Sequence, residues 1–535
     1  MRSASLCAAA LAALTLSACS NSSPPTAKAL DAGAIADQCL DVVKGVNLQQ
    51  ASVLDLQDAL DHGLKSEELV LRYIERIDAF DAPASGAKLN SIRTLEPNVI
   101  DQARAADKTR HASPGYLEGI AVLLKDNVGT NDIPTTAGSI ALALNVPKDD
   151  ATITRKLRAA GAIILGKANL SEFANWVSKT MPNGYSSLGG QVIAPYDFTA
   201  DPSGSSTGPA VAGTMAFAGV TIGTETSGSI ISPSTVHSMV GVKPTVGLVS
   251  RYGIIPLSPS FDTAGPIVRN VVDAAAVLSV IAGVDSNDSA TDKFAQSALK
   301  GVVPDYVAGL NANALKGARL GVRTGDEGQL PLFETAVQVL KDKGATIVEI
   351  QDPASYQVLS SSDLSLVELG AIFNEFKTSL NDYLATLAGP ATPVHSLTDI
   401  ILFNQMHTDK VKYGQDLLIA SDAQSGVEQD PVMIASRTAA ITYAQNWIDQ
   451  MMDLNQLDAI IAPDYSNISV TAAAGYPDVT VPMGYVQQLP HGLSFAGHAF
   501  SEQKLLSLAY AYEQATHLRK PATVVNPDLR ATCPQ

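Results

Sequence analysis

Two clusters of Gly, Ser and Thr flank an apolar segment near the middle of the sequence, in residues 201–235. The stretch reads DPSGSSTGPAVAGTMAFAGVTIGTETSGSIISPST, and 19 of its 35 residues are Gly, Ser or Thr. That share would suit a flexible linker, but residues 209–222 are mostly apolar and predict a buried helix that runs into a strand. Because glycine lets a backbone approach closely and turn with positive φ, each cluster can bring amide N–H groups and a hydroxyl to a ligand. The sequence therefore predicts a packed site rather than a linker.

A serine hydroxyl is a weak nucleophile and needs a base, and the sequence offers a lysine for that role. The clusters contain Ser205 and Ser206, then Ser227 and Ser229. Lys125 ends the apolar run GIAVLLK, which is typical of a buried strand. A buried ammonium is costly unless it is paired or neutral, so Lys125 is a candidate amine base. To act near pH 7, its pKa must fall by about three units from the usual value of about 10.4.

Taken in order, these residues resemble the amidase signature family. Lys125 in LLKDN, Ser205 in GSSTG and Ser229 in GTETSGSI match its Ser-Ser-Lys triad, and the two serines lie 24 residues apart, as the motif requires. Further segments resemble the peptide-amidase-like branch, namely NGYSSLGGQVIAPYD, VGLVSRYGIIPLS, DTAGP and YAYEQATHLRKP. The resemblance runs from about residue 47 to about residue 527. Each residue alone would be typical of a turn or a strand end, and the ordered set is what favours catalysis.

The resemblance implies an amidohydrolase that works through an acyl-enzyme. Ser229 would be the nucleophile, Ser205 the bridge and Lys125 the base, with a cis peptide bond at the bridging serine. An oxyanion hole is implied from the backbone N–H groups of Thr226, Ser227, Gly228 and Ser229. The expected substrate-binding residues are Tyr185, Gly190, Gln191 and Ser206.

Two carboxylates in these motifs could work against the lysine. Asp126 or Glu225 would hold Lys125 in its charged form if either pointed at the ammonium, so we expect that neither does. No cofactor and no metal is expected, because the eight histidines show no HExxH or similar spacing. Expected substrates are C-terminal peptide amides or small acyl and aryl amides, with water as the second reactant.

Two other interpretations stay open. Residues 204–208 also fit G-x-S-x-G, which would make Ser206 the nucleophile of an α/β-hydrolase, with His491 or His517 as its base. The preceding FTADPS is turn-like, whereas that motif needs a strand. The second is a non-catalytic or esterase-like surface lipoprotein on the same fold. A tRNA-dependent amidotransferase is not expected of an exported chain, since its partners are cytosolic.

The periodicity of apolar residues predicts an α/β fold. Helices are expected at residues 53–60, 66–80, 150–160, 271–283, 333–341 and 505–516, with a mostly helical region at 364–452. Strands are expected at residues 163–166, 318–322, 345–350, 459–463, 478–482 and 492–496. A helix is also predicted to start within residues 169–176. The resemblance implies the amidase signature fold for residues 39–535: a single domain whose large mixed β-sheet is covered by helices on both faces.

The first residues are typical of a targeting segment. Residues 1–18 combine one positive charge with a short apolar run, as in a signal peptide. The ending LSAC resembles a lipobox, which implies cleavage before Cys19 and a lipid anchor on that thiol; an ordinary signal cut near Ala18 is the alternative. Residues 19–38 would then be a lipidated tether. The protein is expected in the cell envelope, facing the periplasm or on the outer membrane.

The composition excludes one class of partner. The net charge of −17 argues against nucleic acid, whose phosphates would be repelled. A monomer is expected. The two cysteines left after the signal and the anchor, Cys39 and Cys533, could form a disulfide between the termini or stay as two thiols.

Overall fold

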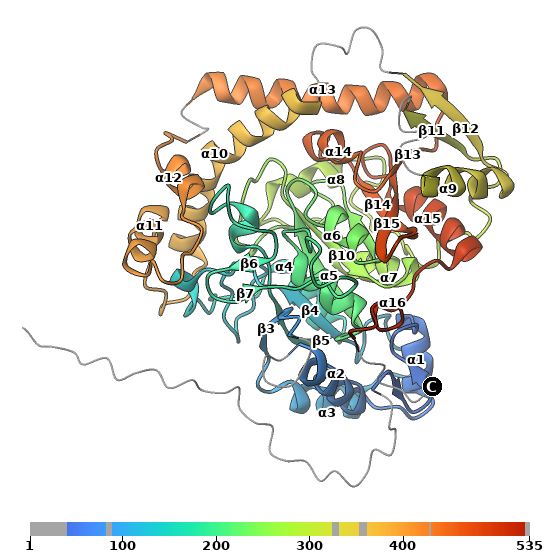
Figure 1. Cartoon of the computed structure of the whole chain (residues 1–535), viewed down its shortest axis with the longest axis horizontal. Helices are drawn as coiled ribbons and strands as arrows, with labels where there is room; N and C mark the ends of the chain where they lie inside the picture. The colour runs from blue at the N-terminus through green and yellow to red at the C-terminus, as the bar shows by residue number, and fades with distance from the viewer. Residues whose placement is uncertain (1–39, 82–87, 324–330, 352–360, 427–429, 530–535) are drawn as a thin grey trace, which may run out of the picture. The chain divides into compact units, whose positions relative to one another are not determined.

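The computed structural model describes residues 40–81, 88–323, 331–351, 361–426 and 430–529 (Figure 1). Within them, eleven strands form one sheet in the order β12-β11-β13-β15-β14-β9-β10-β8-β4-β5-β3. Their bounds are β3 (Ile92–Leu95), β4 (Ala121–Lys125), β5 (Ile163–Ala168), β8 (Val220–Glu225), β9 (Val240–Lys243), β10 (Thr263–Val268), β11 (Arg319–Arg323), β12 (Thr346–Ile350), β13 (Ala459–Pro463), β14 (Asp478–Val486) and β15 (Leu489–Ala496). The predicted signal peptide, its tether and both terminal cysteines lie outside the described residues.

The sheet is mixed, as predicted. β4 runs parallel to β5 and β8, and β11 runs parallel to β12 and β13. The remaining pairings are antiparallel. β4, β5, β8, β9, β10 and β13 are buried along their whole length. Strands covered on both faces read as near-continuous apolar runs, which is why AVLLK and VTIGTE lack the alternation of a half-exposed strand.

Helices cover the sheet. Their bounds are α1 (Val53–Asp61), α2 (Ser66–Phe80), α3 (Val99–Thr109), α4 (Thr152–Ala159), α5 (Thr207–Thr214), α6 (Ile231–Val236), α7 (Val271–Ile281), α8 (Asp292–Gln296), α9 (Pro331–Asp342), α14 (Ile468–Ala474), α15 (Glu502–Thr516) and α16 (Ala522–Val525). α1, α4 and α15 all pack against α7, and α5 packs against α6. The local sequence starts these helices: Ser52 forms a capping box with Asp55, and the Asn270 side chain accepts from the amide of Asp273.

The helix of the central stretch is unusual because all of its residues are buried. α5 reads TGPAVAGT and leads through a short turn into β8, which confirms the predicted helix and strand. Three arginines bind the carbonyl groups of that turn, where the helix leaves acceptors unsatisfied. Their acceptors are Met215 and Ala216 for Arg76, Ala218 and Gly219 for Arg269, and Thr214 for Arg519. Side chains from distant parts of the sequence therefore fix the end of α5 and the start of β8.

The predicted helical region forms a second layer, seen along the top and left of Figure 1. It contains α10 (Ser361–Thr386), α11 (Leu397–Met406), α12 (Asp416–Asp422) and α13 (Pro431–Asn455). Phe376 and Leu380 of α10 share a buried cluster with Phe173, Trp176 and Leu257. In the described parts of the chain, no helix is long and apolar enough to cross a membrane.

The prediction that a helix starts within residues 169–176 is wrong. The structure has only a 3₁₀ turn there, Glu172–Asn175, in which Phe173 and Ala174 have φ of 45° and 56°. Tertiary contacts take the amides that would start a helix. The Ser171 N–H donates to the Ser205 carbonyl at 3.1 Å, and the Phe173 N–H donates to the Ala137 carbonyl at 2.9 Å. The segment is thereby tied to the first Ser/Gly cluster.

Candidate active site

Lys125 lies at the carboxyl end of β4 and has no exposed surface. Its Nζ donates to Ser205 Oγ at 2.8 Å, to Ser206 Oγ at 2.9 Å and to the Thr224 carbonyl at 3.2 Å. The parallel pairing of β4 with β8 places Thr224 beside it. Within the described residues, no carboxylate forms an ion pair with this lysine. The amine is held by neutral oxygens alone.

Burial lowers the pKa of Lys125 from 10.5 to about 7, while the negative charges of Asp262 and Glu225 act in the opposite direction. Neither Asp126 nor Glu225 hydrogen-bonds to the amine. Asp126 accepts from the amide and hydroxyl of Thr136. Glu225 accepts from backbone amides further along its own loop. The expectation that both would point elsewhere is confirmed, and the lysine can lose its proton near neutral pH.

Ser205 and Ser206 are held in different ways. A cis peptide bond joins Gly204 to Ser205, where the resemblance implied one. Ser206 Oγ donates to the Thr224 carbonyl at 2.8 Å and accepts from the Thr224 amide at 3.2 Å, besides accepting from Lys125. Ser206 has no exposed surface and does not border the cavity described below. Ser205 and Ser229 do not line that cavity either, so the substrate contact expected of Ser206 stays a prediction. In the structure, Ser206 Oγ contacts Lys125 and Thr224.

The α/β-hydrolase interpretation is also contradicted. It requires a histidine on Ser206 Oγ, and in the part of the chain that the structure describes neither candidate hydrogen-bonds to it. His491 Nδ1 instead pairs with Asp464 at 2.9 Å. His517 ends α15, and its amide donates to the Glu513 carbonyl.

The second cluster is shaped by the carboxylate of Glu225. Its oxygens accept from the amides of Gly228 at 2.9 Å, Ile230 at 2.7 Å and Ile231 at 3.0 Å. The Gly228 N–H is therefore already used, which corrects its expected place in the oxyanion hole. Across the described residues, the amides of Ser227 and Ser229 have no acceptor and stay candidates for that role, with Thr226. The Ser206 N–H donates to the Ser229 carbonyl at 3.2 Å, so the two clusters are joined directly.

Carboxyl groups also hold the hydroxyls of this loop. Thr226 Oγ1 donates to Asp262 at 2.5 Å, and Asp262 accepts from the amides of Leu257 and Ser258 as well. Burial raises the pKa of Asp262 to about 6. Ser227 Oγ donates to Glu368 Oε2 at 3.0 Å. Glu368 comes from α10 and was not among the predicted site residues, because α10 has other acidic residues, such as Glu375 and Asp382, and no motif distinguishes Glu368 from them.

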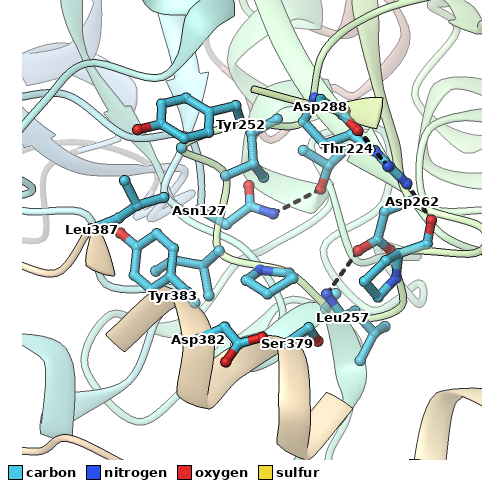
Figure 2. Close-up of a pocket in the computed structure, with 18 of the residues that line it drawn as sticks. Asn127, Thr224, Tyr252, Leu257, Asp262, Asp288, Ser379, Asp382, Tyr383 and Leu387 are labelled. Atoms are coloured by element: carbon cyan, nitrogen blue, oxygen red, sulfur yellow. Dashed lines mark hydrogen bonds and ion pairs between the residues drawn. The ribbon is translucent and has the colours of Figure 1, made fainter. Parts of the chain in front are cut away.

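A cavity of about 310 Å³ adjoins this loop (Figure 2). It begins at Asn127, Thr224, Thr226 and Asp262, and its wall is mostly apolar, with Ala137, Phe173, Ala174, Ile254, Ile255, Pro256, Leu257, Tyr383 and Leu387. In Figure 2, the α10 residues stand on one side, with Asn127, Thr224 and Asp262 across from them. Arg251 also lines the cavity but is paired with Asp288 at 2.7 Å. Asp382 of α10 lines it as well. The cavity therefore suits a largely apolar group without negative charge next to the Thr226–Ser229 loop.

The other predicted substrate-binding residues form a small hairpin of β6 (Tyr185–Ser186) and β7 (Gly190–Gln191). The Tyr185 hydroxyl donates to the Lys410 carbonyl at 3.0 Å, and its ring packs against Tyr413 at 4.8 Å between centroids. Gln191 Nε2 donates to the Asn183 carbonyl at 2.7 Å. The residues that line the cavity do not include this hairpin. Its contact with substrate stays a prediction.

A family model described as Amidase matches residues 68–506. The chain belongs to the amidase family. This amidase is 41% identical to the native peptide amidase from Stenotrophomonas maltophilia, with a TM-score of 0.82 over 88% of this chain and 98% of that one. It is 36% identical to an amidase family protein from Bacillus anthracis, with a TM-score of 0.82 over 90% and 95% of the two chains. It is also 38% identical to a probable amidase of Arabidopsis thaliana, over 89% and 92%.

One further solved structure is similar to this amidase. It is the peptide amidase PAM in complex with the competitive inhibitor chymostatin, again at 41% identity and a TM-score of 0.82, over 88% of this chain and 99% of that one. The predicted family, fold and amidase activity are thus confirmed. Among the described residues, no group of His, Cys, Asp and Glu is placed to hold a metal ion.

Proposed function

We propose that this amidase cleaves carboxamide C–N bonds through an acyl-enzyme on Ser229, with Ser205 as the proton relay and Lys125 as the base. The observation that carries the proposal is the environment of Lys125. It is a fully buried amine, held by Ser205 and Ser206 and free of any carboxylate partner in the described part of the chain, with its pKa lowered to about 7 by burial. Lys167 of β5 and Lys243 of β9 are also buried without an ion pair among the described residues, so what sets Lys125 apart is that its Nζ donates to two serine hydroxyls of the first cluster.

The reaction follows from these groups. Neutral Lys125 takes the Ser205 proton as Ser205 takes the Ser229 proton, and Ser229 Oγ forms a bond to the amide carbon. The carbonyl oxygen gains negative charge, which the free amides of the Thr226–Ser229 loop stabilise; removing one such donor typically costs about 3 kcal/mol of barrier. The C–N bond breaks, and the proton returns through Ser205 to the departing nitrogen. Water then attacks the ester of Ser229 by the same route and releases the acid.

The cavity supports an acyl group with an apolar side chain. It adjoins Thr226, and its one cation, Arg251, is neutralised by Asp288. A free carboxylate in the acyl part would find no unpaired cation among the described lining residues, and it would meet Asp262. We propose C-terminal peptide amides and small acyl or aryl amides as substrates, in line with the likeness to peptide amidases.

The test is ammonia release from a panel of peptide amides and simple acyl amides, with wild type beside Ser229→Ala and Ser206→Ala. Release that disappears in Ser229→Ala and persists in Ser206→Ala supports the proposal, and the panel ranks the substrates. Release that survives in Ser229→Ala places the nucleophile elsewhere. If wild type turns over no amide or ester, the binding-only lipoprotein is favoured. Competitive inhibition by chymostatin is expected, as for the peptide amidase PAM.

We further propose that the chain is exported and anchored by a lipid on Cys19, on the basis of its first 19 residues. Expression of wild type and Cys19→Ala in a bacterial host with metabolic fatty-acid labelling separates the alternatives. A labelled membrane-bound wild type and an unlabelled variant support the anchor. An unlabelled, cleaved wild type indicates an ordinary signal peptide.

A further inference from the structure

Two carboxyl groups hold the loop that carries Ser229, from different elements. Glu225 of β8 accepts three backbone amides of the loop and its continuation. Glu368 of α10 accepts only the Ser227 hydroxyl, at 3.0 Å. Its other oxygen is buried and has no hydrogen-bond partner among the described residues. One acid is therefore saturated with donors, and the other has almost none.

The surroundings of Glu368 disfavour its charged form. The residue is 4% exposed and forms no ion pair in the described part of the chain. An ionised carboxylate without compensating donors is costly at such a site, and the nearby charge of Glu225 adds to that cost. The positive charge of Lys243 in β9 favours the ionised form of Glu368. The same lysine also interacts with the carboxyl groups of Asp478 in β14 and Glu502 in α15.

We propose that Glu368 is a positioning residue for the Ser227–Ser229 loop, and that it performs this role as a neutral carboxylic acid. The inference rests on the proposed function and deepens it. The neutral acid keeps Ser227, and with it the loop amides, in place while α10 covers the cavity. An ionised Glu368 puts a negative charge against the loop where the oxyanion develops, and so opposes turnover.

The consequence is an upper pH limit for the reaction. Burial raises the pKa of Glu368 to about 8, while Lys125 must lose its proton, with a pKa of about 7. As pH rises, kcat therefore increases while Lys125 loses its proton. It decreases again at higher pH, where Glu368 loses its proton, so the pH profile of kcat is bell-shaped. One pH unit above the higher pKa, kcat is expected to have fallen about tenfold. A triad that needs only a neutral lysine has no such alkaline fall.

The test compares kcat–pH profiles of the full chain and its variants on the best amide of the panel. Glu368→Gln keeps an oxygen acceptor for Ser227 and cannot ionise, so it should retain activity at pH 7 and lose the alkaline fall. Glu368→Leu and Ser227→Ala should each lower kcat more than they change KM, and together no more than either alone. Glu513→Gln is the matched control. Glu513 of α15 accepts from the Val271 amide where Glu368 accepts from a hydroxyl. Like Glu368, it has one unpartnered buried oxygen among the described residues and a pKa raised to about 8, but it makes no hydrogen bond to the loop.

An alkaline fall that persists unchanged in Glu368→Gln, or that Glu513→Gln removes equally, overturns the proposal. A second measurement does not need activity. Folding raises the pKa of Glu368 from its ordinary value of 4.5 to about 8. Between these two pH values the folded chain binds a proton that the unfolded chain has lost, so the folded state loses stability as pH rises. The melting temperature of Glu368→Gln should exceed that of wild type by more at pH 8.5 than at pH 6. If wild type turns over no amide, the proposed function fails, and a constant difference in melting temperature would still refute the neutral acid.

Discussion

Replacing the buried base should make the protein more stable while removing its activity. Lys125 has no exposed surface, and its pKa falls from 10.5 to about 7 because burial disfavours the ammonium. At about 1.4 kcal/mol per pH unit, the fall corresponds to about 5 kcal/mol between the two protonation states, of which about 4 kcal/mol opposes folding at pH 7. Lys125→Met removes that cost and fills similar space. It also loses the hydrogen bonds to Ser205, Ser206 and the Thr224 carbonyl. At about 0.5 kcal/mol each, because Ser206 and Thr224 keep their mutual hydrogen bonds, this loss is about 1.5 kcal/mol.

The net gain at pH 7 is therefore about 2.5 kcal/mol, and it depends on pH with a definite sign. Between about pH 7 and pH 10.5 the unfolded chain binds a proton at Lys125 that the folded chain does not, so wild type gains stability as pH rises through this window. The advantage of Lys125→Met should shrink to near zero by pH 10. For a chain of 535 residues, the unfolding entropy is about 1.1 kcal/mol/K, so the gain at pH 7 is about 2 °C in melting temperature.

The assay is thermal unfolding of wild type, Lys125→Met and Ser229→Ala at pH 7, 8.5 and 10, together with amide turnover. Ser229→Ala is the control for inactivity alone, because it keeps the lysine and should keep the pH dependence of wild type. A melting temperature of Lys125→Met below that of wild type at pH 7, or a difference that does not change with pH, would refute the reasoning. The amine would then be charged in the folded protein.

Three further outcomes are expected. Glu225→Gln leaves one oxygen for three amides and turns an NH₂ group toward them. It should cost about 2–4 kcal/mol of stability and reduce kcat, which thermal unfolding and ammonia release would measure. Ser206→Ala removes one of three acceptors of Lys125 and should lower kcat about tenfold without abolishing it; complete loss would assign Ser206 a chemical role. Leu387→Trp should fill part of the cavity and raise KM for amides with bulky acyl groups, while simple acyl amides keep their KM; equal effects on both would separate this cavity from the acyl site.

The contact of Lys125 with the first cluster could be predicted because short motifs carry both. Lys125 ends an apolar run, and the spacing of Ser205 and Ser229 fits one packed element between them. In the structure, Lys125 Nζ donates to Ser205 Oγ, and the Ser229 carbonyl accepts from the Ser206 amide. The alternating helices and strands could also be predicted, because long segments with a regular apolar period usually keep their secondary structure in the folded protein.

The predictions that failed concern groups whose partners are distant in the sequence. The helix expected within residues 169–176 is absent because Ser205 and Ala137 take its first amides. Gly228 was predicted to donate to the oxyanion, but its N–H donates to the Glu225 carboxylate. Glu368 belongs to no motif, and it reaches Ser227 only because α10 folds over the cavity. Pairings of this kind depend on the fold and leave no local signature in the sequence.

The order of the strands has a consequence for how the protein is made. β9 and β11 lie on opposite sides of the hairpin β14–β15 and the strand β13, which join the two parts of the sheet. These three strands are among the last to be synthesised. Until residue 496 has emerged, the nascent chain holds two sheet fragments, each with an open edge that can pair with another chain. Completion of the fold therefore waits for nearly the whole sequence.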